Sequence, residues 1–337
     1  MNDPTILAVI LNFRTPELTL KSAAAALRAM EGLRGEVLVV DNDSADGSFA
    51  HIVEEAQARG WTTGGRLRVV ESGHNGGFGA GMNFGIRTGL SNGTTADFYY
   101  LLNSDAWPEP GALKRLRDFL VANPRAGIAG SFVRGEDGMP HHTAFRFPSI
   151  AGEFEMAART GPISRLLKSA IVAMPIPQTE TRVDWTAGAS LMMRAEMLEE
   201  IGLFDETFFL YYEETDLCRR AGRAGWETWF IPQSEVVHLG SASTGMKGWT
   251  RTPAYWFASR RHYFTKNHGH AYAAAATLAR GAGQAIWELR RTLSGKSQSD
   301  PDRFLRDLIA DGLRAPRQSP APTPALTIAR NAAEDKK

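Results

Sequence analysis

The stretch Tyr99–Trp107 reads YYLLNSDAW and contains both a predicted strand and the polar residues that follow it. The five apolar or aromatic residues Phe98–Leu102 predict a buried strand, which ends in Asn103-Ser104-Asp105. Ligands of open α/β sheets bind outside the carboxyl ends of the strands, so a site is expected here. Asn103 and Asp105 point the same way in an extended segment and could share one hard cation. The alternative is a strand followed by an Asx-turn.

Apolar runs on both sides of this stretch alternate with helical segments. Buried strands are predicted at Ile6–Leu11, Glu36–Val40, Leu67–Glu71 and Gly127–Val133. Helices are predicted over Leu18–Met30, from Ser48 onward and over Gly111–Ala122. Because strands that alternate with helices form βαβ units, the sequence predicts an α/β fold with a mostly parallel central sheet flanked by helices.

A glycine-rich segment, His74–Asn83 (HNGGFGAGMN), follows the third strand. Gly77 and Gly79 begin a GxGxxG pattern, but Met82 stands where the third glycine is required, and no phosphate loop of the GxxxxGKS or GxxxxGKT type is found. Glycines let the backbone approach a ligand closely or adopt positive φ. The segment is either a ligand-binding loop or a glycine-rich turn without a ligand.

Three acids, Glu213, Glu214 and Asp216, stand directly behind an aromatic run in FFLYYEETDLCRR (Phe208–Arg220). Crowded carboxylates beside an aromatic surface have raised and split pKa values, which suits a general base. The alternative is a helix N-terminus, where the dipole favours acids and Asp216 pairs with Arg219 or Arg220.

The rest of the second half is less regular. Residues 139–182 have few periodic signals and are either a segment over a site or an inserted loop. Strand character returns at Val183–Arg194, and two short strands are predicted at Glu227–Ile231 and Glu235–Val237. His238 closes the last strand, where it is either a ligand or a structural residue.

The composition is that of an ordinary globular protein. The 337 residues are 43% hydrophobic and 22% charged, and the net charge of +1 gives no electrostatic reason to expect nucleic acid as a partner. A single cysteine, Cys218, excludes an internal disulfide framework and a cysteine-rich zinc site. The first residues have no basic segment of the kind that opens a signal peptide, and no apolar run is long enough to span a membrane, so a cytoplasmic protein is expected.

The C-terminal third has a local excess of positive charge. Between Met246 and Leu293, eight Lys or Arg residues stand against Glu288 alone, with Trp, Tyr and Phe interleaved. Such a segment suits an anionic membrane surface or the pyrophosphate of a lipid-linked glycan. The alternative is a pair of helices that pack on the rest of the chain with a basic solvated face. One short amphipathic helix is predicted at Asp302–Leu313, and a disordered tail is predicted after it.

Five elements stand in a fixed order: a strand ending in Asn12-Phe13, VVDNDSADGS (Val39–Ser48), HNGGFGAGMN, LLNSD (Leu101–Asp105), and GLFDETFFLYYEETDLCRR (Gly202–Arg220) with His238 behind it. This series resembles the family 2 glycosyltransferases, and among them the bacterial rhamnosyltransferase-like group, over residues 5–265. The resemblance implies a GT-A fold. Its catalytic domain would span 1–245, with a nucleotide-binding half at about 1–133 and an acceptor half at about 134–245. Basic, aromatic-rich C-terminal helices (246–295) and a short helix with a disordered tail (296–337) would follow.

Roles in this family carry over residue by residue. Asp41 matches the carboxylate that binds the pyrimidine base, with Asn12 at the floor of the same pocket. The segment along the nucleotide corresponds to Asn75, Gly76, Gly77, Gly79 and Asn83. Asn103-Ser104-Asp105 matches the metal motif DxD, and His238 a histidine that can complete the metal site.

The resemblance also implies which residues carry out the reaction. Glu214 matches the catalytic base, with Asp216 as its partner acid and Glu213 as the next candidate. Trp185 and Gly188 are expected to line the cleft for the donor sugar and acceptor. Two positions depart from the family pattern. Asn103 replaces the first acid of DxD and is a weaker ligand for Mg²⁺ or Mn²⁺. Glu214 replaces the commoner Asp, which shifts the carboxylate by about 1–1.5 Å, a distance that matters in a positioned site.

The implied activity is metal-dependent, inverting sugar transfer from dTDP-rhamnose to a hydroxyl of a surface glycan or a polyprenyl-diphosphate-linked precursor, at the inner face of the plasma membrane. A UDP-sugar such as UDP-galactofuranose is the alternative donor. A nucleotidyltransferase and an inactive glycan-binding module are the alternatives from other classes.

Overall fold

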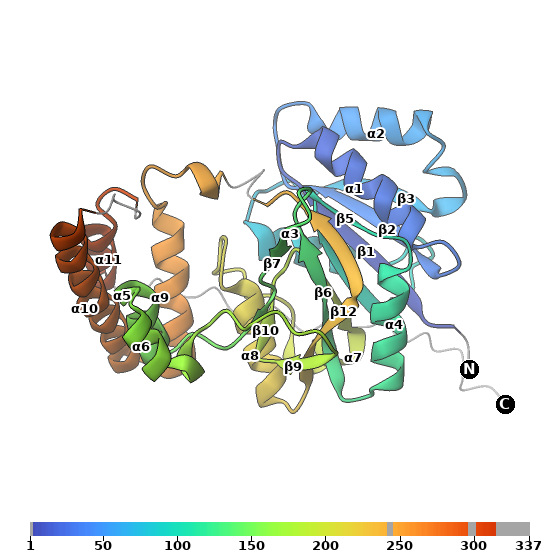
Figure 1. Cartoon of the computed structure of the whole chain (residues 1–337). Helices are drawn as coiled ribbons and strands as arrows, with labels where there is room; N and C mark the ends of the chain where they lie inside the picture. Colours follow the sequence, from blue (N-terminus) through green and yellow to red (C-terminus); the bar gives the residue numbers. More distant parts are fainter. Residues whose placement is uncertain (1–2, 241–244, 296–300, 315–337) are drawn as a thin grey trace.

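The structure, a computed structural model, describes residues 3–240, 245–295 and 301–314 (Figure 1). One large sheet runs through it. Its strands, in spatial order, are β3 (Leu67–Glu71), β2 (Arg34–Asp41), β1 (Thr5–Asn12), β4 (Phe98–Asn103), β11 (Ser190–Arg194), β6 (Ala126–Arg134), β12 (Glu227–His238) and β5 (Ala106–Pro108). β7 (Pro140–His141) pairs with β6 and β9 (Thr181–Val183) with β12, while β8 (Ala144–Phe145) and β10 (Trp185–Thr186) form a separate pair.

Most of the central pairings are parallel. β1 pairs in parallel with β2 and β4, β2 with β3, and β6 with β12. β11 is antiparallel to both of its neighbours, β4 and β6. The predicted α/β class with a mostly parallel sheet is therefore confirmed, and the sheet is mixed.

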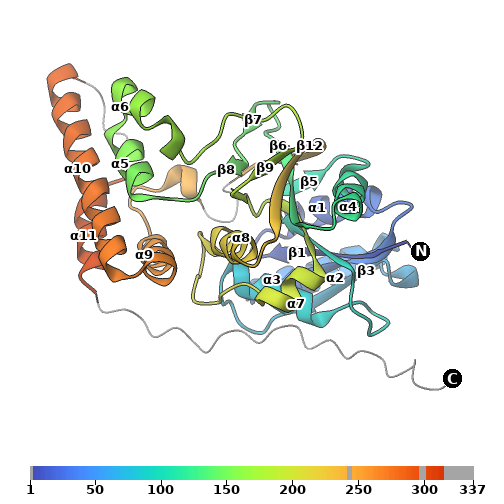
Figure 2. The ribbon, with the colours of Figure 1, turned by 90° about the horizontal axis from the view of Figure 1, so that it is seen from below.

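The central strands are apolar throughout because both faces of the sheet are covered. Along β1, Ile6, Ala8 and Ile10 pack into one core, whereas Leu7 and Val9 pack into the core of the opposite face, as the two-residue period of a strand requires. The first core is shared with α1 (Pro16–Ala29), α2 (Ser48–Ala58) and α4 (Ala112–Ala122). The second is shared with α3 (Phe78–Thr88), α7 (Ala195–Ile201) and α8 (Glu213–Arg223). Figure 2 shows α1 and α4 on one side of the strands and α3 and α7 on the other.

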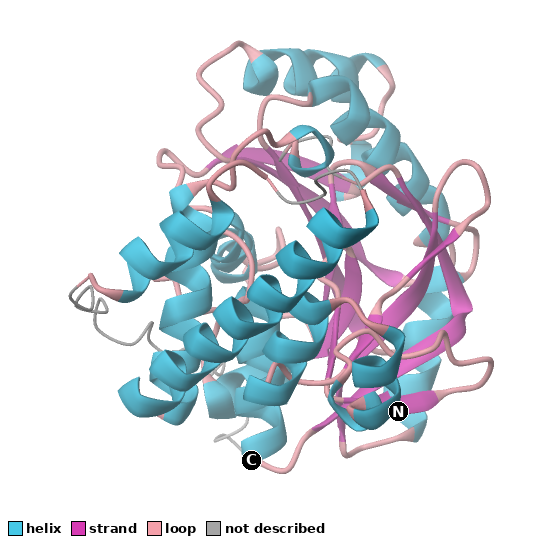
Figure 3. Ribbon diagram, turned by 60° about the vertical axis from the view of Figure 1, so that its left-hand side comes forward, coloured by secondary structure: helices cyan, strands magenta, loops and turns pink. Residues whose placement is uncertain are grey.

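A group of helices stands beside the sheet, and we call it the helical unit (Figures 1 and 3). It consists of α5 (Ile150–Ala158), α6 (Gly161–Leu166), α9 (Ala254–His268), α10 (His270–Ser294) and α11 (Phe304–Gly312). Inside it, the buried guanidinium of Arg260 on α9 pairs at 2.9 Å with the buried carboxylate of Glu153 on α5, and Arg280 of α10 also reaches that carboxylate. Segments about 100 residues apart in the sequence are thus joined.

The strands and helices predicted in the first half are all present. The glycine-rich segment differs, since α3 begins at Phe78 and Gly79 and Gly81 lie inside this helix. The two strands predicted at 227–231 and 235–237 are one strand, β12, with an irregular register between Ile231 and Glu235. Residues 139–182 form β7, β8, α5, α6 and β9 with a short turn at Lys168–Ala170, and α5 and α6 belong to the helical unit. Short helical turns also occur at Thr63–Gly65 and Met246–Gly248. The helix predicted at 302–313 is α11, whereas the predicted tail after residue 314 lies outside the described residues.

The positive charge of segment 246–293 is largely paired in three dimensions. Six of its eight basic residues form ion pairs with carboxylates, namely Arg251, Arg260, Arg261, Lys266, Arg280 and Arg291. Most of their partners, such as Asp205, Asp307 and Asp311, lie outside the segment. The local net charge along the sequence is therefore not the charge of this surface. No helix in the described part of the chain combines the length and the apolar character needed to cross a bilayer.

Candidate active site

A cavity of about 770 Å³ lies at the carboxyl ends of β1 and β4, bounded on its far side by α9. Nine of the residues predicted as site residues line it: Asn75, Gly77, Asn103, Asp105, Trp185, Gly188, Glu213, Glu214 and His238. Six others lie outside its lining: Asn12, Asp41, Gly76, Gly79, Asn83 and Asp216. Residues from both halves of the sequence therefore meet at one cavity.

Asp105 and His238 form one wall of this cavity. β5 runs antiparallel to β12 with Ala106 opposite His238, and the Leu239 amide donates to the Asp105 carbonyl at 3.1 Å. This pairing brings His238 Nε2 to 3.0 Å from Asp105 Oδ1 and 3.3 Å from Asn103 Nδ2. A carboxylate, an imidazole and an amide thus face one point at the end of β4.

This donor set can be compared with the needs of a divalent cation. The described residues contain no cluster of three or more His, Cys, Asp or Glu side chains that could hold a metal. Mg²⁺ is commonly bound by one or two carboxylates together with substrate phosphates rather than by an all-protein cage. Asp105, His238 and the neutral amide of Asn103 fit such a shared site, in which a diphosphate supplies the remaining oxygens.

Glu213 and Glu214 approach the cavity from the first turn of α8. Tyr211 and Tyr212, directly before them, both have φ of 70°, a left-handed conformation that is strained in non-glycine residues. Glu214 Oε1 accepts a weak hydrogen bond from the Gly188 amide at 3.4 Å. The Oε2 atoms of both glutamates are buried and have no hydrogen-bond partner among the described residues.

The surroundings of these two carboxyls set their proton affinity. Burial raises the pKa of Glu214, while backbone amides, including that of Gly188, act in the opposite direction. Burial and the neighbouring Glu214 carboxylate together raise the pKa of Glu213 well above its ordinary value. A carboxyl with a raised pKa that points into a cavity has the protonation behaviour of a general base or acid.

Asp216 faces away from the cavity. It is fully buried, and its Oδ2 accepts from Arg220 Nε at 2.9 Å and from Lys266 Nζ at 2.7 Å. Its Oδ1 accepts from Asn267 Nδ2 at 2.9 Å. Asp216 therefore links α8 to α9 and does not line the cavity, and its catalytic role stays a prediction. The alternative pairing with Arg220 is what the structure shows.

Asp41 and Asn12 form a buried network at the ends of β2 and β1. The Asp41 carboxylate accepts from Asn12 Nδ2 at 2.6 Å, from the Ser44 hydroxyl at 2.7 Å and from the Ser44 amide at 3.0 Å. Asn42, the next residue, does line the cavity and donates to Asn75 Oδ1 at 3.0 Å. Asn42 was missed as a site residue, although its place after a strand end was the available signal.

The glycines before and within α3 serve packing. Gly77 has φ of 93°, and a Cβ there would overlap the carbonyl of Phe209; a Cβ at Gly81 would overlap Leu11 of β1. Asn83 lies inside α3, where its amide bonds to the backbone of Phe204 on both sides. Gly79 and Gly81 therefore lie in a helix rather than in a loop, and these residues let α3 approach β1 and the segment before α8. The ligand role of the segment stays a prediction.

Aromatic rings and two histidines complete the cavity. Trp185 stacks on Phe145 with ring centroids 4.1 Å apart, and its Nε1 donates to the Arg146 carbonyl at 2.9 Å. On the opposite side lie Phe209, Tyr211, Tyr255 and Trp256. His141 and His142, which the sequence did not single out, also line the cavity, and the ring of His141 lies 6.3 Å from that of His238.

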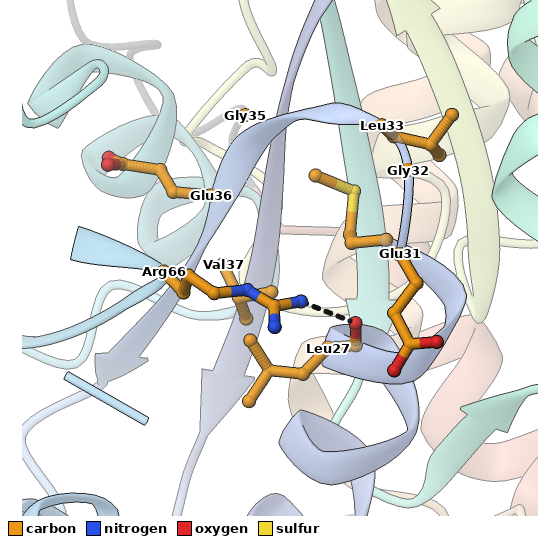
Figure 4. A pocket seen from close by; sticks show the side chains of 9 residues that line it. Leu27, Glu31, Gly32, Leu33, Gly35, Glu36, Val37 and Arg66 are labelled. Carbon is orange, nitrogen blue, oxygen red and sulfur yellow. Dashed lines mark hydrogen bonds between the residues drawn. The ribbon is translucent and has the colours of Figure 1, made fainter. Parts of the chain in front are cut away.

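A second cavity, of about 190 Å³, lies at the opposite end of β2 (Figure 4). Its lining includes Leu27, Glu31, Gly35 and Arg66, and Arg66 donates to the Leu27 carbonyl at 3.1 Å. None of the predicted site residues lies there, so the larger cavity is the candidate active site.

Comparisons with known proteins bear on this site. Residues 8–166 match the family described as Glycosyl transferase family 2. The N-acetylglucosaminyl-diphospho-decaprenol L-rhamnosyltransferase of Mycobacterium tuberculosis is 29% identical over 280 residues, which cover 74% of this chain and 88% of that protein. The dTDP-rhamnosyl transferase RfbF of Shigella flexneri is 24% identical over 266 residues, covering 78% of each chain.

The fold is shared with a solved structure, the mannosyltransferase PcManGT from Pyrobaculum calidifontis in complex with GDP-Man and Mn²⁺. The TM-score is 0.56 at 16% identity, covering 88% of this chain and 77% of the other. The predicted GT-A fold with appended C-terminal helices is confirmed. The match of residues 8–166 to the family 2 glycosyltransferases, the relatives and the fold all agree with the order of elements in the sequence.

Proposed function

We propose that the chain transfers a sugar from a pyrimidine sugar nucleotide, with dTDP-L-rhamnose as the first choice, to a hydroxyl of a lipid-linked precursor of a surface glycan. One observation carries this proposal. A single cavity has Glu214 on one wall and the Asp105–His238 pair on another, between aromatic surfaces. The named relatives, a decaprenol-linked L-rhamnosyltransferase and a dTDP-rhamnosyl transferase, support the choice of donor and acceptor.

In the proposed reaction, Glu214 acts as the general base. The acceptor oxygen forms a bond to the anomeric carbon as the bond from that carbon to the diphosphate oxygen breaks, and the configuration inverts. The acceptor proton passes to a Glu214 carboxylate oxygen, a step that contributes about 10²–10⁴-fold to the rate. The Gly188 amide orients this carboxylate through a hydrogen bond to Oε1.

The donor would lie toward the ends of β1, β2 and β4. A carboxylate can accept about four hydrogen bonds, and the Asp41 carboxylate already accepts three. About one acceptor position therefore remains for the pyrimidine base of the donor. Asn75 and Asn42 present amides to the nucleotide side of the cavity. Mg²⁺ or Mn²⁺ held by Asp105, His238 and Asn103 would neutralise charge on the departing diphosphate. The reaction would take place in the cytoplasm, at the inner face of the plasma membrane.

The test is a binding screen of dTDP-rhamnose, UDP-galactofuranose, UDP-glucose, GDP-mannose and dTTP, each with and without Mg²⁺ or Mn²⁺. Thermal shift and calorimetry should detect saturable, metal-enhanced binding of dTDP-rhamnose that Asp105→Ala and Asp41→Ala weaken. Preference for UDP-galactofuranose would change the donor but keep the class. Binding of the triphosphate alone would favour a nucleotidyltransferase, and no binding at all would favour an inactive glycan-binding module.

A further inference from the structure

The outer face of α10 is apolar and exposed to solvent. Leu278, Leu289 and Leu293 have 74%, 63% and 80% of their surface exposed. Between Ala271 and Leu289, every exposed residue of this helix is Ala or Leu. The solvent-exposed face of a helix in a globular protein is normally polar or charged, so an apolar exposed face is unusual.

The spacing of these residues aligns them along the helix. At 100° per residue, Leu278, Ala282, Ala285, Leu289 and Leu293 fall within about 80° of arc and extend over about 22 Å. The opposite face packs inside the helical unit: Ala273 and Ala276 lie in the core with α9, and Gly283 lies against α5. The apolar stripe therefore has no partner among the described residues.

The elements of the helical unit carry more basic than acidic residues. The segments 150–170, 254–294 and 301–314 contain twelve Lys or Arg and six Asp or Glu. Three of the six acids, Glu153, Glu288 and Asp311, are already paired with α9 or α10. Arg165, Lys168, Arg303 and Arg306 are exposed. Exposed apolar residues accompany them, with Leu166 83% exposed on α6 and Leu313 84% exposed next to α11.

We propose that the helical unit docks on an anionic lipid leaflet through the outer stripe of α10, with the exposed basic residues in and next to α6 and α11 at the headgroups. An apolar stripe flanked by cationic residues is the pattern of a helix that lies in the membrane interface. The stripe cannot span the bilayer, because no described helix is long and apolar enough to do so. This differs from the sequence expectation, which gave the membrane role to the basic and aromatic residues of 246–293.

This surface is connected to the site. α9 packs on α10 and carries Tyr255 and Trp256, which form one side of the cavity. Docking would hold that side of the cavity near the membrane and present it to a lipid-linked acceptor. The link to the acceptor rests on the proposed function, whereas the membrane contact itself does not.

The experiment is flotation of the full chain with vesicles of phosphatidylcholine alone or with one quarter phosphatidylglycerol. The wild type should float with the anionic vesicles and much less with the neutral ones. The combined variant Leu278→Ser, Leu289→Ser, Leu293→Ser should lower the bound fraction about tenfold. Val121→Ser, which replaces an exposed apolar residue on α4, should leave it unchanged.

Two further measurements make the outcome decisive. Light scattering distinguishes a lipid surface from a second copy of the chain: a concentration-dependent dimer that the triple variant abolishes would overturn the proposal, as would undiminished flotation of that variant. Circular dichroism and donor binding verify that the variants are folded. Because flotation needs no sugar transfer, an inactive chain that still floats would contradict the proposed function alone.

Discussion

The amide nitrogen of Phe78 donates a hydrogen bond to the carbonyl oxygen of Phe209 at 3.0 Å. This bond joins the start of α3 to the segment that leads into Glu213 and Glu214. Gly77, Phe78 and Phe209 all line the cavity. The glycine-rich segment thus supports the turn that carries Glu213 and Glu214, in addition to lining the cavity.

Gly77→Ala is expected to lower both stability and activity. The new Cβ would overlap the Phe209 carbonyl, and the residue would have to keep a φ of 93°. The strain alone is about 1–3 kcal/mol. Thermal melting and kcat measure the effect. Gly73→Ala is the matched control, since Gly73 also has positive φ (70°) but has open space around its Cβ position. Equal melting temperatures for the two variants would contradict the packing role.

Glu213→Gln should become relatively more stable as the pH rises. Burial raises the pKa of Glu213 in the folded state above its unfolded value. The stability contributed by the neutral carboxyl is therefore complete below the unfolded pKa and is lost as pH rises through the folded pKa. Melting curves of wild type and variant from pH 4.5 to 8.5 test this. Curves that run parallel across the range would show that Glu213 titrates normally.

The pH profile of turnover should have an acid limb set by Glu214. The base must be ionised, and burial raises the pKa of Glu214, so kcat should fall as the pH drops through a value above 4.5. Glu214→Gln should lower kcat by about 10²–10⁴-fold and keep donor binding. Near-normal turnover of this variant would remove Glu214 from the base role and leave Glu213 as the candidate.

Asp216→Ala should destabilise the protein strongly. Its loss would leave Lys266 and Arg220 partly buried without their shared carboxylate, which costs about 3–5 kcal/mol for a broken buried pair. Denaturant unfolding measures this. Arg59→Ala, which breaks an i,i+4 pair with Glu55 near the surface, should cost about 0.3–0.5 kcal/mol. A stable Asp216→Ala variant with abolished turnover would restore the catalytic interpretation.

Asn103→Asp should lower the metal concentration needed for half-maximal donor binding. A second carboxylate beside Asp105 and His238 adds charge where the structure supplies a neutral amide. Calorimetry of donor binding at increasing Mn²⁺ concentration measures the change. Asp105→Asn should raise the metal concentration needed for half-maximal donor binding. If chelation leaves donor binding of the wild type intact, the site has no metal role.

Local patterns explain most of what the sequence predicted. The first strands are long apolar runs because both faces of each strand are buried, and the polar residues that follow them sit at one sheet edge by topology. Asp105 and His238 were paired through the family pattern, although 133 residues separate them. The order of these elements along the sequence was sufficient to predict the fold.

The missed features depend on contacts between distant segments. Gly77, Gly81 and Asn83 resemble ligand-loop residues in sequence. In the structure they allow α3 to approach β1 and residues 204–209. The contacts of the Asp216 carboxylate with Lys266 and Asn267, about 50 residues away in the sequence, indicate a structural role. The paired bases of segment 246–293 are a similar case, since most of their acids come from α5, α11 and Asp205.

The left-handed pair Tyr211–Tyr212 bears on how the protein can be divided. The turn before Glu213 is held from outside the sheet: Ser259 of α9 donates to the Leu210 carbonyl at 3.0 Å, and the Tyr212 ring packs 5.3 Å from that of Tyr263. A chain cut at residue 245 would retain every carboxylate of the site yet lose the helix that keeps this turn in its strained shape. The sheet and the helical unit therefore depend on each other at this turn, and a chimaera joined at that boundary would pair the turn with a helix that does not fit it.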